Sequence, residues 1–156
     1  MRKWKNNNGR VELTFKNQLS GLYMNFYNES FKYEIKGGQT ENPFTRSRKL
    51  ETSRSAPATS MIITLFNRYK IDKVENNLNN DLRDIAIKVK NYNKSEQHGI
   101  RKGNYKHILD IIKKYFLDNS TESWYVPYPS RWPKDALAAF TPLEKLPTIK
   151  QLFDPS

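Results

Sequence analysis

The sequence contains no cysteine, which excludes disulfide bonds, thiolate zinc sites and cysteine nucleophiles. Histidine is almost as scarce, because His98 and His107 alone are available for acid–base chemistry or metal binding. No stretch of the chain approaches the roughly 18 consecutive apolar residues that a membrane-spanning helix requires. Hydrophobic residues make up 37% of the chain, which predicts a modest core. We therefore expect a small protein with no cofactor, no metal site and no transmembrane segment.

Positive charge is what the chain has in excess. The 27 lysines and arginines outnumber the 16 acidic residues and give a formal net charge of +11. A surplus of this size attracts polyanions, above all nucleic acid. The basic residues concentrate in residues 1–54 and 93–116, whereas residues 72–92 are balanced in charge. The N-terminus has charges without an apolar segment behind them, so we expect no secretory signal and an intracellular or virion-associated location.

Period-two alternation of apolar residues predicts an antiparallel three-stranded β-meander over residues 10–36. The alternating sets are Val11, Leu13 and Phe15, then Leu22, Met24 and Phe26, then Phe31, Tyr33 and Ile35. Gly37 and Gly38 are expected to end this sheet. Tyr23 and Tyr27 alternate with the buried set, so we expect them on the opposite, more exposed face.

A basic linker over residues 37–56 and then three helices over residues 57–117 are predicted to follow. The first helix would bury one apolar face after Pro57, formed by Ala58, Ile62, Leu65, Phe66 and Tyr69. The second spans 71–92, where Asp72 and Glu75 resemble a capping box and the apolar spacing approaches a heptad seam, formed by Ile71, Val74, Leu78, Leu82, Ile85, Val89 and Tyr92. The third spans about 105–117, and a basic loop over 93–103 separates it from the second.

The C-terminal part changes in composition, because prolines and large aromatic residues alternate from Trp124 onwards. This pattern predicts an extended tail over residues 124–156, with one short helix at 134–140, that packs on its own domain or on a partner. The predicted fold class is thus α+β. It comprises a single domain over residues 1–123, with the meander followed by helices, and the extended Pro/aromatic tail.

The basic residues and the aromatic residues between them predict a non-enzymatic, largely sequence-nonspecific nucleic-acid-binding protein. Lysine and arginine neutralise phosphates, and exposed rings stack on unpaired bases, so RNA or single-stranded DNA is favoured. The candidate binding residues are Arg2, Lys3, Trp4, Lys5, Arg10, Lys16, Tyr23, Tyr27, Lys32, Arg46, Arg48, Lys49, Arg54, Lys94, Arg101, Lys102 and Lys106. The competing interpretation of each basic segment is a solvated connector.

Two alternative functions stay open. The chain could be a structural subunit of a viral particle or ribonucleoprotein, or a homo-oligomer, that associates through the 71–92 helix and through tail residues Trp124, Tyr125, Tyr128, Arg131 and Trp132. A small metal-dependent nuclease is the less favoured alternative. Its E-x-K motif would be Glu34 and Lys36, with Glu12 or Glu29 as the second carboxylate. For His98, and for His107 near Asp110, an ordinary hydrogen-bonding role is expected.

Overall fold

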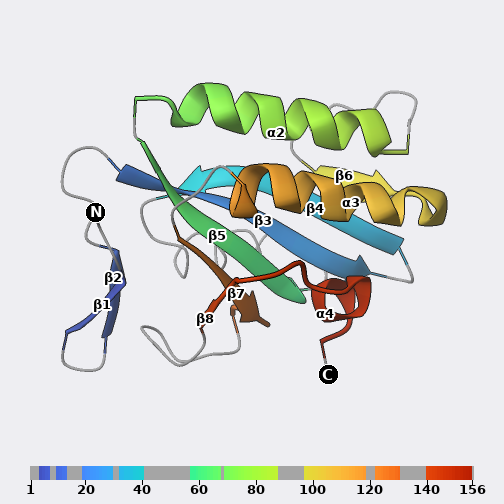
Figure 1. The fold of residues 1–156 in the computed structure, drawn as a ribbon. Coiled ribbons are helices and arrows are strands. Elements are labelled where there is room, and N and C mark those ends of the chain that lie inside the picture. Colours follow the sequence, from blue (N-terminus) through green and yellow to red (C-terminus); the bar gives the residue numbers. More distant parts are fainter. Residues whose placement is uncertain are drawn as a thin grey trace.

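The computed structural model has a mixed α+β fold, as the sequence predicts, and the residues that it describes form a six-stranded antiparallel sheet with three α-helices (Figure 1). It describes residues 4–7, 10–13, 19–29, 32–40, 57–67, 69–87, 97–118, 122–130 and 140–155. For the first two of these segments only the backbone is described.

The elements follow one another in a β-rich order. The strands are β1 (Trp4–Asn7), β2 (Arg10–Leu13), β3 (Leu19–Glu29), β4 (Lys32–Thr40), β5 (Ser60–Asn67), β6 (Gln97–Ile100), β7 (Ser123–Pro127) and β8 (Thr141–Pro142). The helices are α2 (Ile71–Ile85), the 3-10 turn η1 (Lys102–Asn104), α3 (Tyr105–Ile112), the π-helical turn η2 (Lys113–Leu117) and α4 (Ile149–Phe153).

The main sheet has the strand order β6-β4-β3-β5-β7-β8, and every neighbouring pair is antiparallel. The chain therefore forms a hairpin from β3 and β4 and adds β5 beside β3. It then crosses through α2 to the β6 edge and returns through α3 to β7 on the other side. Strand β3 is central, because it pairs with β4 on one side and β5 on the other along most of its length.

One face of the sheet packs against all three helices. Leu22, Met24 and Phe26 of β3 belong to the same buried cluster as the inner faces of α2 and α3 and as Leu152 and Phe153 of α4. The helical stripes supply Ile71, Leu78, Leu82, Ile108, Ile111, Ile112, Tyr115 and Phe116. Burial of this apolar area is the main favourable contribution to folding.

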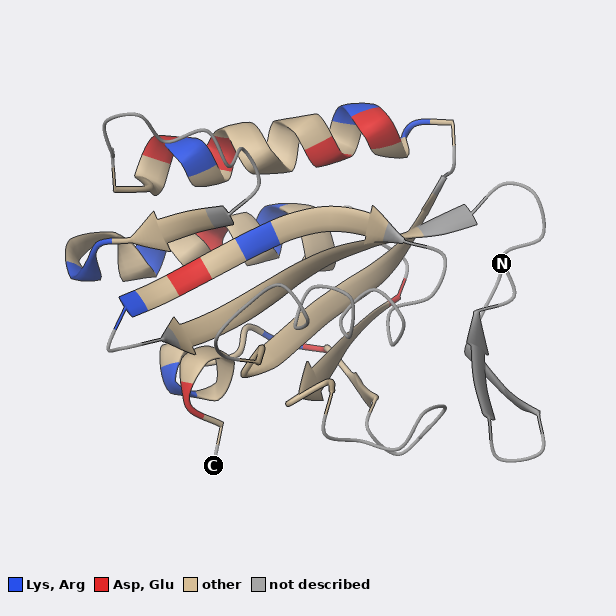
Figure 2. Cartoon of the chain, turned by 180° about the vertical axis from the view of Figure 1, so that it is seen from behind, with Lys and Arg blue, Asp and Glu red and all other residues tan. Residues whose placement is uncertain are grey.

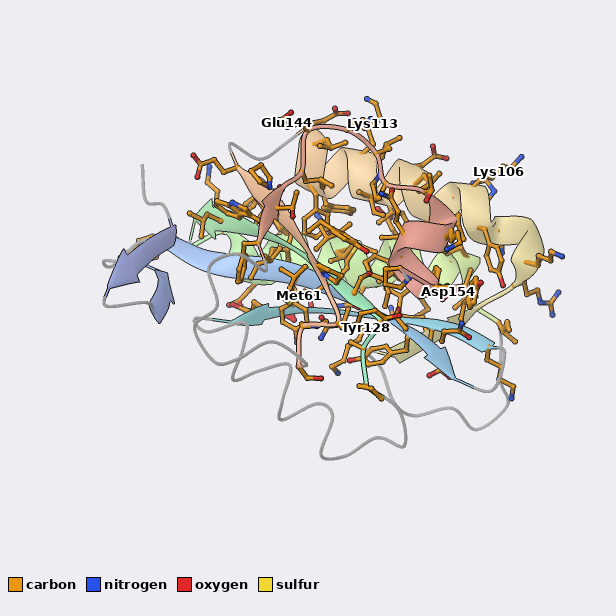
Figure 3. All side chains as sticks on the ribbon, turned by 90° about the horizontal axis from the view of Figure 1, so that it is seen from below. Met61, Lys106, Lys113, Tyr128, Glu144 and Asp154 are labelled. Atoms are coloured by element: carbon orange, nitrogen blue, oxygen red, sulfur yellow. The ribbon has the colours of Figure 1, made fainter. Side chains whose placement is uncertain are left out.

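The opposite face of β3 is buried as well, which contradicts the prediction that Tyr23 and Tyr27 are exposed. Tyr23 is 1% exposed and Tyr27 is fully buried. Their neighbours across β5 are Met61, Ile63 and Leu65, so this second face is apolar too. Figure 3 places Met61 on the side of the sheet away from Lys106 and Lys113 of the α3–η2 segment. A central strand buried on both faces has no solvent-facing residues, and period-two alternation cannot distinguish it from a half-buried strand.

The predicted meander is not the one that forms. Strand β2 does begin at Arg10, but it pairs with β1 in a separate two-stranded sheet, with Trp4 opposite Leu13. The third strand beside the β3–β4 hairpin is β5, in the segment predicted as a helix after Pro57. Its short apolar run is rich in β-branched residues, and such runs are typical of a buried strand rather than of a helix.

Gly37 and Gly38 do not end the sheet, because both lie inside β4. A Cβ atom at Gly37 would lie 3.0 Å from Leu78 Cδ2 of α2, so the absence of a side chain lets the helix approach the strand. Gly38 lies opposite Tyr23, and the Tyr23 ring lies over it. The glycine pair therefore permits close packing on both faces of β4.

Two predicted helices are confirmed, with different ends. Helix α2 begins at Ile71 but ends at Ile85, because Ala86 forms a β-bridge with Ile100 and the Ile87 N–H donates to Gly99 O. The described seam residues pack in the chain's own core, and Val89 and Tyr92 lie outside the described residues. Asp72 and Glu75 do not cap the helix; they accept hydrogen bonds from Gln39 Nε2 at 2.6 and 2.8 Å.

The C-terminal segment is built into the fold where the structure describes it. Strand β7 pairs with β5, and β8 pairs with β7. Helix α4, which the sequence did not predict, begins with a capping box between Thr148 and Gln151. The Leu152 carbonyl accepts hydrogen bonds from the hydroxyls of Thr59, at 2.7 Å, and Ser60, at 2.8 Å. The predicted helix at 134–140 falls outside the described residues, except for Phe140, which is not helical.

Candidate nucleic-acid interface

Four of the predicted binding residues meet at one end of the sheet. Lys32 begins β4, Arg101 follows β6, Lys102 begins η1 and Lys106 lies in the first turn of α3. Because Tyr33 pairs with Ile100 in the β4–β6 ladder, the residues just beyond that pair, Lys32 and Arg101, lie at the same end. Figure 2 shows basic residues at the start of β4 and in the turn that leads into α3. We call these four residues the basic end.

All four side chains of the basic end are exposed. Among the described residues, no hydrogen bond or ion pair involves any of the four side chains. Other lysines of the same helical segment are compensated: Lys113 Nζ lies 2.7 Å from Asp118 Oδ2, and Lys114 Nζ lies 3.0 Å from Asp81 Oδ2. Glu34, partly buried, follows two residues after Lys32 on β4. The β3–β4 register also pairs Lys32 with the acidic Glu29. The four cations of the basic end are thus exposed at a surface whose neighbouring acidic residues in β3 and β4 are Glu29 and Glu34.

The backbone at the basic end is held by its neighbours. Arg101 is extended, the Asn104 N–H donates to Arg101 O at 2.9 Å, and Asn104 Nδ2 donates to Ile85 O of α2 at 2.9 Å. The first N–H groups of a helical segment, here those of Lys102 and Gly103, have no acceptor within the helix. These groups add partial positive charge next to the cationic side chains.

Two partly exposed tyrosines that the sequence analysis did not propose as ligand contacts accompany the basic end. Tyr33 and Tyr105 stack with ring centroids 4.9 Å apart and an interplanar angle of 25°. Burial, and secondarily Tyr33, raises the pKa of Tyr105 above its usual value, so its hydroxyl is uncharged at neutral pH. The pattern Arg101-Lys102-Gly103-Asn104-Tyr105-Lys106, with an aromatic residue between cations, could have identified Tyr105.

Tyr23 and Tyr27 are not part of this surface, because the fold buries both rings on the second face of β3. The predicted stacking of bases on these two tyrosines is therefore wrong for the folded chain. Many of the other candidates lie outside the described residues, namely Arg2, Lys3, Lys16, Arg46, Arg48, Lys49, Arg54 and Lys94. Trp4, Lys5 and Arg10 lie in β1 and β2, of which the structure describes only the backbone.

The tail residues proposed for partner binding divide in the same way. Arg131 and Trp132 lie outside the described residues, whereas Trp124 and Tyr125 lie in β7 and are partly buried. The Tyr125 hydroxyl donates to Gln151 O, and burial, opposed by a hydrogen bond with Ser60, raises the pKa of Tyr125 to about 12. Tyr128 follows with a φ of 45°, and its N–H donates to Thr59 O at 2.9 Å.

The candidates for acid–base or metal chemistry do not converge. His98 is buried and its Nε2 lies 3.3 Å from Asn79 Oδ1, whereas His107 Nδ1 lies 3.7 Å from Asp110 Oδ2 on the surface of α3. The residues directly opposite Glu34 are Tyr27 and Gly99, neither of which is a carboxylate. Among the described residues, no group of three His, Cys, Asp or Glu side chains lies together.

No protein-family model, curated protein or solved structure matches this chain. In the part of the chain that the structure describes, no helix has the length and apolar character needed to cross a membrane. The choice of a function therefore depends on the chemistry of the surface. On the described surface, the four cations of the basic end form a cluster. The large exposed hydrophobic residues Tyr69, Ile87 and Leu146 do not, because each lies on a separate segment.

Proposed function

We propose that this protein binds nucleic acid non-enzymatically, through its phosphates, and that the basic end is one of its contact surfaces. The observation that carries the proposal is the gathering of Lys32, Arg101, Lys102 and Lys106 at one end of the sheet, exposed and without a described ion pair. Cations in such an arrangement neutralise phosphates and release condensed counterions, which drives binding without reading sequence. The formal net charge of +11 gives long-range attraction in the same direction.

The structural-subunit alternative has less support on the described surface. An obligate interface needs a contiguous apolar core, whereas Tyr69, Ile87 and Leu146 are dispersed. The described part of the predicted seam on α2 packs inside the chain, and Tyr125 of the tail bonds within the chain. These residues are therefore engaged in the fold rather than presented to a partner.

A salt-titrated binding assay tests the proposal. The variant replaces the basic end by glutamine, as Lys32→Gln, Arg101→Gln, Lys102→Gln and Lys106→Gln together. The matched control removes equal charge from exposed lysines elsewhere, as Lys70→Gln, Lys73→Gln, Lys113→Gln and Lys145→Gln. Fluorescence anisotropy with oligo(dT), oligo(U) and a DNA duplex gives affinity against salt concentration.

If each of the four residues neutralises one phosphate, the basic-end variant loses about 3 units of salt slope on a single strand and about 4 on a duplex. The control variant should lose affinity only through its reduced net charge, and much less. Equal losses in the two variants would mean that charge alone attracts the polyanion and that the basic end is not a binding surface. No binding of any nucleic acid by the unmodified chain would overturn the proposed function itself.

A further inference from the structure

The tyrosines beside the basic end are supported by buried aromatic rings. Tyr33 stacks on Phe153 with centroids 4.0 Å apart and planes 6° from parallel. Phe153 in turn meets Phe26 edge-on at 5.5 Å, and both phenylalanines are fully buried. Tyr33 and Tyr105 therefore form the partly exposed side of an aromatic cluster that is fixed to the core, and little side-chain freedom remains to be lost on binding.

Cations flank both tyrosines along the chain, although Lys32 points to the face of β4 opposite Tyr33, because successive residues of a strand alternate faces. Lys32 precedes Tyr33 in β4, while Lys102 lies three residues before Tyr105 and Lys106 directly after it. Residues three apart on a helical turn are neighbours on its surface, so Lys102 and Tyr105 share one side of the segment. A ligand that contacted Tyr105 would have its charged groups near Lys102 and Lys106 of the same segment.

We infer that Tyr105, supported by Tyr33, is a stacking position for an unpaired base, and that the preferred partner is single-stranded nucleic acid, DNA or RNA. This inference rests on the proposed function and deepens it by naming the substrate class. In a duplex the faces of the bases are already stacked on one another, whereas a single strand presents them to an aromatic side chain. The phosphates on either side of the stacked base would meet Lys102, Lys106 and Arg101.

The test separates the ring from the charge. Tyr105→Leu removes the aromatic face, keeps an apolar side chain against Tyr33 and leaves all four cations in place. Tyr105→Trp keeps a stacking face, and Tyr69→Leu is a matched control at a tyrosine that is 78% exposed. Affinity is measured for oligo(dT), oligo(U), a duplex of the same length and heparin, after thermal unfolding has confirmed that each variant folds.

Loss of one stacked base lowers affinity by about tenfold or more. Tyr105→Leu should therefore weaken oligo(dT) and oligo(U) binding about tenfold and leave duplex and heparin binding unchanged. Tyr105→Trp and Tyr69→Leu should bind single strands like the unmodified chain. A photoreactive 5-iodouridine strand should crosslink to the peptide that contains Tyr105.

The two proposals fail differently. If Tyr105→Leu binds single strands unchanged, or loses heparin and duplex affinity to the same extent, the stacking inference is wrong while phosphate binding by the basic end stands. If Tyr105→Trp also loses single-strand affinity, the position contributes through packing rather than stacking. If the unmodified chain binds no nucleic acid, the proposed function fails and the inference fails with it.

Discussion

Replacement of Gly38 by alanine should destabilise the fold, because the second face of β4 has no room for a side chain there. A Cβ atom at Gly38 would lie 2.5 Å from Tyr23 Oη and 2.6 Å from Tyr23 Cζ. Real Cβ atoms essentially never approach other heavy atoms this closely, so the Tyr23 ring must move. Tyr23 is a rigid side chain of the central strand β3 and is 1% exposed, so its displacement would disturb the packing of the second face of the sheet.

The magnitude follows from two opposing effects. Overpacking of a buried site costs about 1–3 kcal/mol. Replacing glycine by alanine reduces the entropy of the unfolded chain, which returns about 0.4–1 kcal/mol. The net loss of unfolding free energy for Gly38→Ala is then about 1.5 kcal/mol, which lowers Tm by about 3–6 °C in a protein of this size.

The assay is urea and thermal unfolding followed by circular dichroism. Gly103→Ala is the matched control, because a Cβ atom there would have no neighbour within 4 Å, and it should be neutral or slightly stabilising. A double variant, Gly38→Ala with Tyr23→Leu, should lose less than the sum of its single variants, because the clashing phenol is gone. Strict additivity, or a Gly38→Ala variant as stable as Gly103→Ala, would refute the close approach of Tyr23.

Two further predictions concern buried polar groups. Asn25 is 1% exposed, and both polar atoms of its side chain lack a hydrogen-bond partner in the described structure. Asn25→Val should therefore raise the free energy of unfolding, measured in urea melts, by about 1–2 kcal/mol. A loss of stability would reveal a partner for the amide. The pKa values of Tyr115 and Tyr125 are raised, mainly by burial, so the stability that they contribute is complete below their unfolded pKa of about 10 and is lost as pH rises toward about 12 and beyond. Alkaline unfolding should therefore begin above about pH 10. Tyr115→Phe removes the 2.6 Å hydrogen bond from the Tyr115 hydroxyl to Asp81, and the free energy of unfolding of this variant should fall less steeply with pH above about 10. An unchanged pH profile of stability would exclude Tyr115 as the source of the alkaline unfolding.

The sequence predicts the helices where the apolar pattern extends over several helical turns. The seam from Ile71 to Ile85 and the stripe from Ile108 to Phe116 each follow one helical face, and both bury that face against the sheet. The helix ended earlier than predicted because Ala86 and Ile87 pair with β6, a long-range interaction that local spacing does not reveal. The helix predicted after Pro57 is wrong, because a short apolar run fits a buried strand, here β5, as well as a helix.

The N-terminal pairing of β1 with β2 has a local signal in the sequence. Asn8-Gly9 lies between β1 and β2, and Asn-Gly between two strand-like runs is a strong hairpin signal. By contrast, β6 has only four residues, including Gly99, and its sequence has no periodicity to detect. It forms because the edge of β4 offers backbone partners, with Glu34 opposite Gly99. Such a strand is specified by its neighbour rather than by its own residues.

The sequence shows which residues of the candidate site are charged, but not which of them lie close together in the fold. The sequence identified Lys32, Arg101, Lys102 and Lys106 as basic, but only the β4–β6 register brings Lys32 to Arg101 across more than sixty intervening residues. The sequence pattern also favours Tyr23 and Tyr27 over Tyr33 and Tyr105 as ligand contacts, because strand alternation predicts one exposed face, whereas Tyr23 and Tyr27 are buried. The structure reverses this preference, because β3 is buried on both faces. Tyr33 lies near the start of β4, where it is partly exposed and stacks on Tyr105.

The burial of both sheet faces supports our proposal that the binding surface lies at the end of the sheet. The three helices cover one face of the sheet, and the residues of β3 and β5 on the other face are buried, so neither face of the central strands can present side chains to a ligand. Strand ends and the turns that follow them have no such constraint, because their residues project beyond the packed layers. At the end where β4 begins and β6 passes into α3, that freedom coincides with four cations and two tyrosines anchored on Phe153. A fixed ring beside exposed cations suits the nonspecific single-strand binding that we propose, because the ring can stack on any base and the cations neutralise the phosphates.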